Sequence, residues 1–196
     1  MPAKPIKLKG AWNDGYALDY HIVRSEFMGY DDRGHALFDT ERTELGELLY
    51  QLKYRGDMTV IDKIVKTACD FVRAWKIMPD LIVPVPPSRA GRRVQPVSEI
   101  AKGMGANLKI AVSDKSVVKV KQTPELKDIN DYQERLNLLK DAYDVRDQSL
   151  KGKTVLIVDD LFRSGATLNA LTEVLLNKGQ VNKVFVLALT RTRSAP

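Results

Sequence analysis

The sequence predicts an α/β fold with a central, mostly parallel sheet flanked by helices and an N-terminal β-hairpin appendage. Three observations carry this prediction. Apolar, β-branched runs typical of buried parallel strands alternate with segments of helical periodicity. The chain has 196 residues, 44% of them hydrophobic, which is enough for one α/β core and a small appendage. Its first part instead alternates apolar and polar side chains, as a hairpin does.

The N-terminal segment is the predicted appendage. Apolar side chains alternate over residues 16–22, residues 31–34 have the composition of a turn, and residues 35–38 return. We therefore divide the chain into a hairpin appendage, or hood, over residues 1–43 and a main domain over residues 44–196. The hood would cap the sheet or cover part of the site.

Two helices follow. Leucines recur at helical spacing over residues 45–52, and residues 61–75 have an apolar face at the same spacing. Cys69 lies in the second helix, so we expect a buried structural thiol without a catalytic role. It is the single cysteine, so neither a disulfide framework nor a cysteine-rich zinc module is expected. His21 and His35 have no cysteine partners and are not expected to bind metal.

The middle of the chain predicts a strand, a helix and a second strand. An apolar run begins at Leu81 and is ended by prolines, which fix φ and remove donors. A helix over residues 97–102 and a short strand over residues 108–112 come next. Gly103 and Gly105 resemble part of a dinucleotide loop, but they follow a helix rather than a strand. We therefore expect them to stop that helix.

The segment from Thr154 to Thr167 is the most informative. An apolar strand ends in Asp159 and Asp160 and is followed by a small, hydroxyl-bearing turn that opens a helix over residues 168–178. The free N–H groups of such a turn and helix N-terminus bind anions. Ionised aspartates can only accept hydrogen bonds, so they suit ribose hydroxyls or a metal ion. The segment thus offers donors for a phosphate and acceptors for a sugar.

This segment is open to three other interpretations. A receiver domain would need a later phosphoacceptor aspartate, and no aspartate follows Asp160. A P-loop would need a lysine shortly after Gly165, and none is present there. Both interpretations fail. An ordinary strand-to-helix turn with an acidic cap stays open.

Residues 155–167 resemble the phosphoribosyl pyrophosphate (PRPP) binding motif of type I phosphoribosyltransferases, and the chain is similar to the ComF-like branch of that family. The resemblance extends to residues 52–57, 83–89 and 121–137, and so covers roughly residues 44–190. It implies the type I phosphoribosyltransferase fold for the main domain. The first 43 residues depart from the family pattern, which commonly begins with a cysteine-rich zinc module.

The resemblance implies an enzyme that transfers a phosphoribosyl group. An unidentified acceptor would displace pyrophosphate from ribose C1, with Mg²⁺ as the cofactor. Asp159 and Asp160 would act in catalysis by holding the ribose hydroxyls, and would also be the metal ligands. The 5′-phosphate would be bound by the turn, which consists of Arg163, Ser164, Gly165, Ala166 and Thr167.

The positive charge of the chain is concentrated between residues 86 and 127. Nine lysines and arginines there stand against three acids, a net charge of +6 that equals that of the whole chain. Such a lobe fits a small polyanion such as PRPP or a nucleic-acid backbone. Within it, the resemblance makes Ser88 and Arg89 ligands of the pyrophosphate. A proline-ended surface turn is the alternative.

The segment over residues 119–137 is polar and charged, and the resemblance makes it a lid that folds over PRPP. Lys119 and Lys121 would be its catalytic cations, reaching the diphosphate, while Arg135 would fix the return of the loop. A solvated helix over residues 133–139, with Arg135 as a surface charge, stays open.

Arg163 stands where purine-salvage members of the family place an acidic residue. This departure argues against hypoxanthine or guanine as the acceptor. A non-catalytic PRPP-binding or DNA-associated, competence-like accessory protein is the rival hypothesis, and a homodimer is compatible with either. Neither a run of 18 apolar residues nor a signal-peptide pattern occurs, so we expect no membrane partner and a cytoplasmic protein.

Overall fold

A computed structural model describes residues 3–87, 95–121, 129, 131–146 and 148–193. Within this part of the chain a six-stranded sheet has the order β1-β2-β10-β9-β5-β6. All its neighbouring strands are parallel except β1 and β2. The strands are β1 (Ile6–Lys7), β2 (Asp14–Tyr20), β5 (Leu81–Pro84), β6 (Ala111–Val112), β9 (Thr154–Phe162) and β10 (Lys183–Arg191). The predicted mostly parallel sheet is confirmed.

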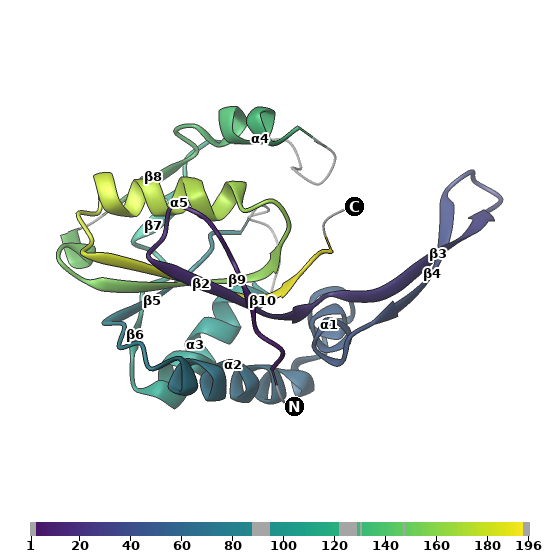
Figure 1. Ribbon diagram of the computed structural model, residues 1–196, viewed down its shortest axis with the longest axis horizontal. Coiled ribbons are helices and arrows are strands. Elements are labelled where there is room, and N and C mark those ends of the chain that lie inside the picture. Colours follow the sequence, from purple (N-terminus) through teal and green to yellow (C-terminus); the bar gives the residue numbers. More distant parts are fainter. Residues whose placement is uncertain (1–2, 88–94, 122–128, 130, 147, 194–196) are drawn as a thin grey trace.

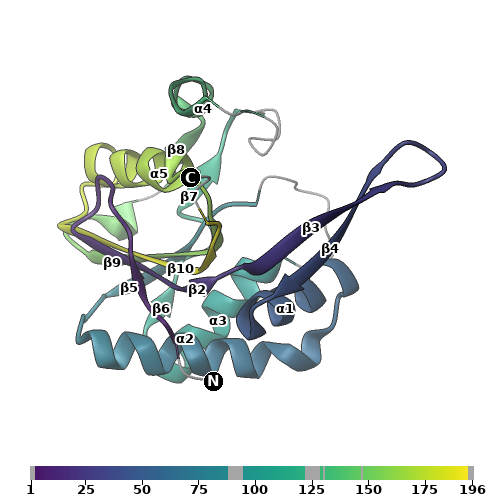
Figure 2. The same cartoon turned by 45° about the vertical axis from the view of Figure 1, so that its right-hand side comes forward.

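Helices cover both faces of this sheet (Figures 1 and 2). On one side lies α5 (Ala166–Asn177), beyond which α4 (Tyr132–Leu139) packs. The other side carries α1 (Glu44–Tyr50), α2 (Ile61–Trp75) and α3 (Pro96–Leu108). None of the helices in the described ranges is both long and apolar enough to cross a membrane.

Short elements connect these layers. A π-helical turn, η1 (Gln51–Arg55), follows α1, and a 3₁₀ turn, η2 (Met58–Val60), precedes α2. Strands β7 (Val117–Lys119) and β8 (Tyr143–Val145) form a separate antiparallel pair on the α5 side, and η4 (Gln148–Leu150) precedes β9.

Strand β9 is buried on both faces. Val155 and Ile157 belong to the core between the sheet and α5, while Leu156 and Val158 belong to the core between the sheet and α2 and α3. This alternation follows from the two-residue period of a strand. A continuous apolar run is therefore what a central parallel strand requires.

The predicted helix over residues 61–75 is confirmed as α2, with Cys69 inside it. Cys69 is fully buried, and burial raises the pKa of its thiol to about 11. The thiolate is the reactive form of cysteine. The predicted burial of this thiol is confirmed, and burial disfavours its reactive form.

The prediction that Gly103 and Gly105 stop a helix is wrong, because α3 continues through both to Leu108. The glycines instead allow close packing. A Cβ at Gly103 would lie 2.7 Å from Cγ2 of Val65, and one at Gly105 would lie 2.3 Å from Cγ2 of Val112. The strand expected over residues 108–112 is shorter, because α3 extends to Leu108 and β6 covers only Ala111–Val112.

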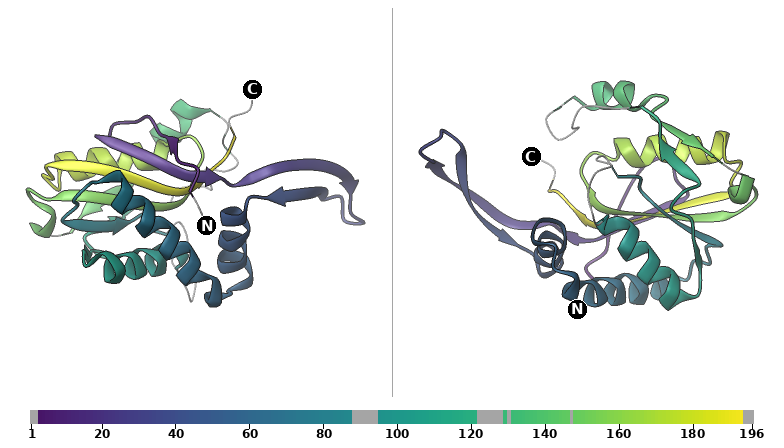
Figure 3. Two further views of the ribbon diagram at one scale, coloured as in Figure 1. Left: turned by 60° about the horizontal axis from the view of Figure 1, so that its bottom comes forward. Right: turned by 180° about the vertical axis from the view of Figure 1, so that it is seen from behind.

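The N-terminal hairpin is confirmed, but its arms differ from those predicted. They are β3 (Ile22–Tyr30) and β4 (Ala36–Arg42), which project from the body of the molecule (Figures 1 and 3). Residues 14–20 instead form β2, which pairs with β10 in the main sheet. The segment of alternating side chains over residues 16–22 thus belongs mainly to β2, and only its last residue, Ile22, belongs to the hairpin. The domain division after residue 43 stays a prediction.

The projecting hairpin exposes aromatic side chains. Phe27, Tyr30 and Phe38 are 53%, 69% and 58% exposed, respectively. The ring centroid of Phe27 lies 5.2 Å from that of Tyr30 and 5.7 Å from that of Phe38. These rings contact one another rather than the core of the main sheet.

Gly105→Ala tests the packing of α3. Alanine favours a helix over glycine by about 1 kcal/mol, so an increase in stability would be expected on propensity alone. Because the new Cβ meets Val112 and the Ile110 carbonyl oxygen, we expect a net loss of about 1–3 kcal/mol in the free energy of unfolding, measured by urea titration. Adding Val112→Ala should recover part of the loss; a stabilised single variant would contradict this packing.

Candidate functional site

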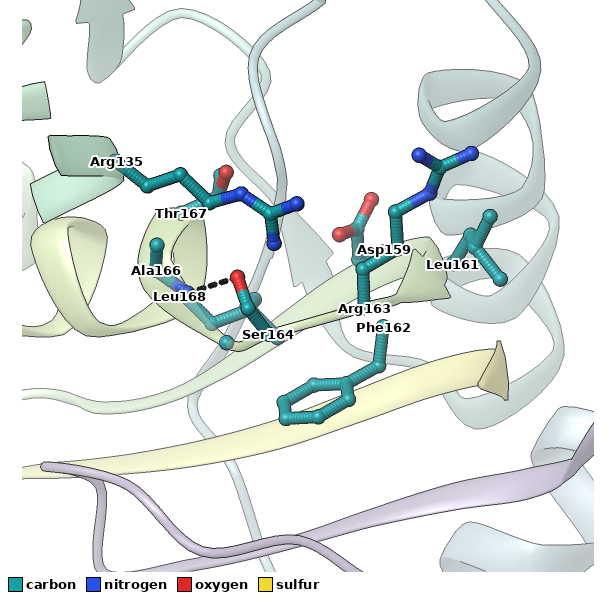
Figure 4. Close-up of a pocket in the computed structure, with 10 residues that line it drawn as sticks. Arg135, Asp159, Leu161, Phe162, Arg163, Ser164, Ala166, Thr167 and Leu168 are labelled. Carbon is teal, nitrogen blue, oxygen red and sulfur yellow. Dashed lines mark hydrogen bonds between the residues drawn. The ribbon is translucent and has the colours of Figure 1, made fainter. Parts of the chain in front are cut away.

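A small cavity lies where β9 ends and α5 begins (Figure 4). Its volume is about 120 Å³. The lining residues are Arg135, Asp159 and residues 161–168. The predicted phosphate-binding turn therefore forms most of this cavity.

Gly165 allows the turn to pass directly into α5. Its φ is +80°, a left-handed conformation that L side chains rarely adopt, and it is the N-cap of the helix. A Cβ at this position would also lie 3.0 Å from the Phe162 ring. Phe162 in turn meets Trp12 edge to face, with ring centroids 6.4 Å apart. The buried rings of Phe162 and Trp12 thus pack against the turn at Gly165.

The first turn of α5 presents Thr167 to the cavity. Its side chain is hydrogen-bonded to the Tyr143 hydroxyl, which is supplied by β8. Burial, together with the negative charge of Asp159, raises the pKa of Tyr143 and keeps this phenol protonated. Tyr143 was not singled out from the sequence, since nothing local links it to Thr167. It fixes the hydroxyl that would donate to a bound phosphate.

Asp159 lies at the floor of the cavity, and its surroundings disfavour its charge. Burial raises the pKa of its carboxyl group to about 7, and the nearby charge of Asp160 acts in the same direction. The backbone N–H of Asp160, which donates to Asp159 Oδ1 at 2.9 Å, and the charge of Lys53 oppose this rise. A cationic or hydrogen-bond-donating ligand would favour the ionised form.

Asp160 faces the opposite side of the sheet, as the next residue of a strand must. Its Oδ2 is 2.6 Å from Nζ of Lys53, which η1 supplies. Burial acts against the lysine charge, but Asp160 outweighs it and raises the pKa of Lys53. The sequence left residues 52–57 without assigned roles; the structure places Lys53 directly at the acidic pair.

Two arginines flank the Asp159 carboxylate in Figure 4. Arg163 extends from the turn, and Arg135 reaches across from α4. Arg135 is fixed by its Nε, which donates to the carbonyl oxygen of Ile129 at 2.6 Å. The helix left open over residues 133–139 therefore exists, but Arg135 lines the cavity rather than serving only as a surface charge.

Of the remaining predicted residues, the two that the structure describes, Lys119 and Lys121, do not line the cavity. Lys119 ends β7 opposite Tyr143, and burial lowers its pKa. Lys121 is exposed and follows two residues later. Ser88 and Arg89, and the lid residues 122–128, lie outside the described part of the chain. The roles of these residues stay predictions.

The described residues contain no group of three or more His, Cys, Asp or Glu side chains that could enclose a metal ion. Mg²⁺ does not require such a group, because it is commonly held by one or two carboxylates together with substrate phosphates and water. The oxygen donors of Asp159, beside the turn over residues 163–167, fit this kind of site. Asp160 already has Lys53 as a partner.

The fold and this site define a phosphoribosyltransferase-type protein. The family of the phosphoribosyl transferase domain matches residues 61–195, and the chain belongs to it. The resemblance to the type I, ComF-like branch is likewise confirmed. The chain is 28% identical over 156 residues to the competence protein ComFC of Bacillus subtilis (strain 168), a match that covers 74% of this chain and 59% of ComFC.

Solved structures are similar to this chain. Glutamine PRPP amidotransferase from B. subtilis, complexed with ADP and GMP, has a TM-score of 0.50 and 15% identity over 80% of this chain and 34% of that chain. Adenine phosphoribosyltransferase from Thermoanaerobacter pseudethanolicus has a TM-score of 0.46 and 16% identity over 86% of this chain and 94% of its own. At these identities the likeness concerns the fold alone.

Asp159→Asn and Asp160→Asn should change stability in opposite directions. The folded-state pKa of Asp159 lies above its ordinary value of 3.8, so the stability linked to its protonated form is complete below pH about 4 and is lost as the pH rises through about 7. Asn should therefore stabilise the ligand-free protein more at pH 8 than at pH 4.5. Asp160→Asn leaves Lys53 unpaired and should cost about 1–3 kcal/mol.

Urea unfolding of both variants and the wild type at the two pH values measures these effects. Equal losses of stability for the two substitutions at pH 8 would contradict the different environments of the two carboxylates.

Proposed function

We propose that this protein is a PRPP-dependent phosphoribosyltransferase that acts with Mg²⁺ on an acceptor still to be identified. The observation that carries the proposal is the cavity at the end of β9, where the turn over residues 163–167, Arg135 and Asp159 converge. Membership of the phosphoribosyl transferase domain family supports the reaction class. A cytoplasmic location is part of the same proposal.

The cavity would receive the 5′-phosphate of PRPP. Backbone N–H groups at the start of α5 and the Thr167 hydroxyl would donate to it, since a helix N-terminus favours an anion. Arg135 and Arg163 would add charge-assisted hydrogen bonds. Ser88 and Arg89 would bind the pyrophosphate, and Lys119 and Lys121 would approach it as the lid closes.

The carboxylates would act on the sugar. Positive charge develops on the ribose ring as the bond from C1 to pyrophosphate breaks, and negative groups placed beforehand stabilise such charge. Asp159 and Asp160 would supply this charge and accept hydrogen bonds from the ribose hydroxyls. Mg²⁺ would neutralise charge on the departing diphosphate when bound. A closed lid over residues 119–137 would exclude water that otherwise hydrolyses PRPP.

A second candidate is a non-catalytic PRPP-binding or nucleic-acid-associated accessory protein. It is favoured by the positive charge between residues 86 and 127 and by the competence role in the name of the relative ComFC. The two candidates differ in one measurable respect. An enzyme releases pyrophosphate from PRPP in the presence of an acceptor, whereas an accessory protein binds without turnover.

Thr167→Val should weaken PRPP binding by about tenfold, because one donor to the 5′-phosphate is lost, worth roughly 1.5 kcal/mol. Calorimetric titration with PRPP and Mg²⁺ measures this change. Thr172→Val is the matched control in the same helix, since the buried Thr172 hydroxyl donates to the Leu168 carbonyl oxygen, away from the cavity. Wild-type protein that binds no PRPP would overturn the ligand assignment.

Pyrophosphate release separates the two candidates. We expect wild-type protein with PRPP and Mg²⁺ to release pyrophosphate with at least one member of a panel of nucleobases, amides, amines and ammonium. PRPP binding without any release, together with DNA binding that weakens steeply as salt increases, would favour the accessory protein.

A further inference from the structure

His21 occupies the junction between β2 and β3, at the carboxyl edge of the sheet. Its backbone N–H donates to the Arg191 carbonyl oxygen at 2.8 Å, and its carbonyl oxygen accepts from the N–H of Thr43 at 3.3 Å. The hairpin root, the end of β10 and the start of α1 thus fix this residue. It is neither an exposed residue of the hairpin nor part of the fully buried core.

Hydrogen bonding assigns the tautomer of His21. Its Nδ1 lies 3.1 Å from Oγ1 of the fully buried Thr190. The Thr190 hydroxyl donates its single proton to the backbone carbonyl oxygen of Asp160 at 3.0 Å. Thr190 can therefore only accept from the imidazole, so Nδ1 carries the proton. In the neutral ring Nε2 is then left with its lone pair, and no described residue donates a hydrogen bond to it.

The surroundings of His21 keep its ring neutral. Burial lowers its pKa, as do the positive charges of Arg42, Lys53 and Arg163, while Asp160 opposes them. These groups come from β4, η1, β9 and the turn after β9. Through the Thr190 hydroxyl, His21 is linked to the backbone of Asp160, whose carboxylate meets Lys53.

We propose that His21 is a catalytic residue that accepts the proton of the attacking group during phosphoribosyl transfer. This inference rests on the proposed function. It assigns a base to a site in which Arg163 takes the place that purine-salvage enzymes give to an acid. The acceptor is accordingly a nucleophile that carries an N–H or O–H proton, such as an amine, an amide or a hydroxyl compound.

The step conserves atoms and charge. The lone pair of the attacking nitrogen or oxygen forms the new bond to ribose C1, and the bond from C1 to the pyrophosphate oxygen breaks with its electron pair leaving on pyrophosphate. The proton of the nucleophile moves to Nε2, giving an imidazolium ion. Negative charge brought by PRPP would offset the cations around His21 in this state. Solvent takes the proton after product release.

Nitrogen NMR tests the tautomer without any substrate. The chain has only two histidines, so ¹⁵N-histidine labelling and the variants His21→Asn and His35→Asn assign both rings. We expect His21 to be protonated at Nδ1 and to have an unprotonated Nε2 at neutral pH. A ring protonated at Nε2 would overturn the proposal.

Kinetics test the catalytic role. His21→Asn places an amide near the position of Nδ1 but has no group at that of Nε2. With PRPP, Mg²⁺ and either ammonium or hydroxylamine as the probe nucleophile, we expect pyrophosphate release to fall at least about 100-fold. PRPP affinity, measured by calorimetry, should stay within about twofold. His35→Asn is the matched control, because His35 is exposed at the hairpin turn and bonded to Asp31.

The outcomes distinguish this inference from the function on which it rests. Absence of PRPP binding by the wild type would overturn both. PRPP binding without pyrophosphate release with either nucleophile, or a His21→Asn rate within about twofold of the wild type, would overturn the role of His21 and leave PRPP binding intact.

Discussion

The pairing of β9 between β10 and β5 is the constraint on which the site depends. Val158 is paired with Leu187 on one side and Pro84 on the other, and is fully buried. The strand is thereby paired on both sides up to the residue before the two aspartates, and β10 continues to pair with it as far as Phe162. Because a strand alternates its side chains, Asp159 enters the cavity beside α5 while Asp160 meets Lys53 on the other face. Adjacent residues with the same chemistry therefore have different surroundings.

Each side of the strand end has its own support. On the α5 side, Trp12 and Phe162 hold the glycine turn, and Tyr143 holds Thr167. On the opposite side the hydrogen-bond chain from His21 through Thr190 ends on the backbone of Asp160. The turn over residues 163–167 and the two aspartates are thus positioned by groups from β8, from β10, from the residue after β2 and from the loop before β2. Preorganised groups of this kind can stabilise developing charge without rearranging during a reaction.

The sequence predicted what is encoded locally. The helix over residues 61–75, the buried thiol and the strand-turn-helix segment each depend on side-chain periodicity or on a few neighbouring residues, and all are present. Lys53 was not assigned, because its partner Asp160 is 107 positions away. Gly103 and Gly105 were misjudged for the same reason, since the packing that selects them comes from Val65 and Val112. Tertiary contacts of this sort leave no local signal.

The β3–β4 hairpin should open independently of the main sheet. Its strands contact each other far more than they contact the main sheet, and a two-stranded ribbon alone is marginally stable in water. Amide protons of this ribbon should therefore exchange with deuterium through local opening, at a free-energy cost well below that of global unfolding. The amides of Leu156 to Val158, buried in the centre of the sheet, should exchange only when the whole domain unfolds. Local order in the β3–β4 ribbon would thus be set separately from the stability of the sheet.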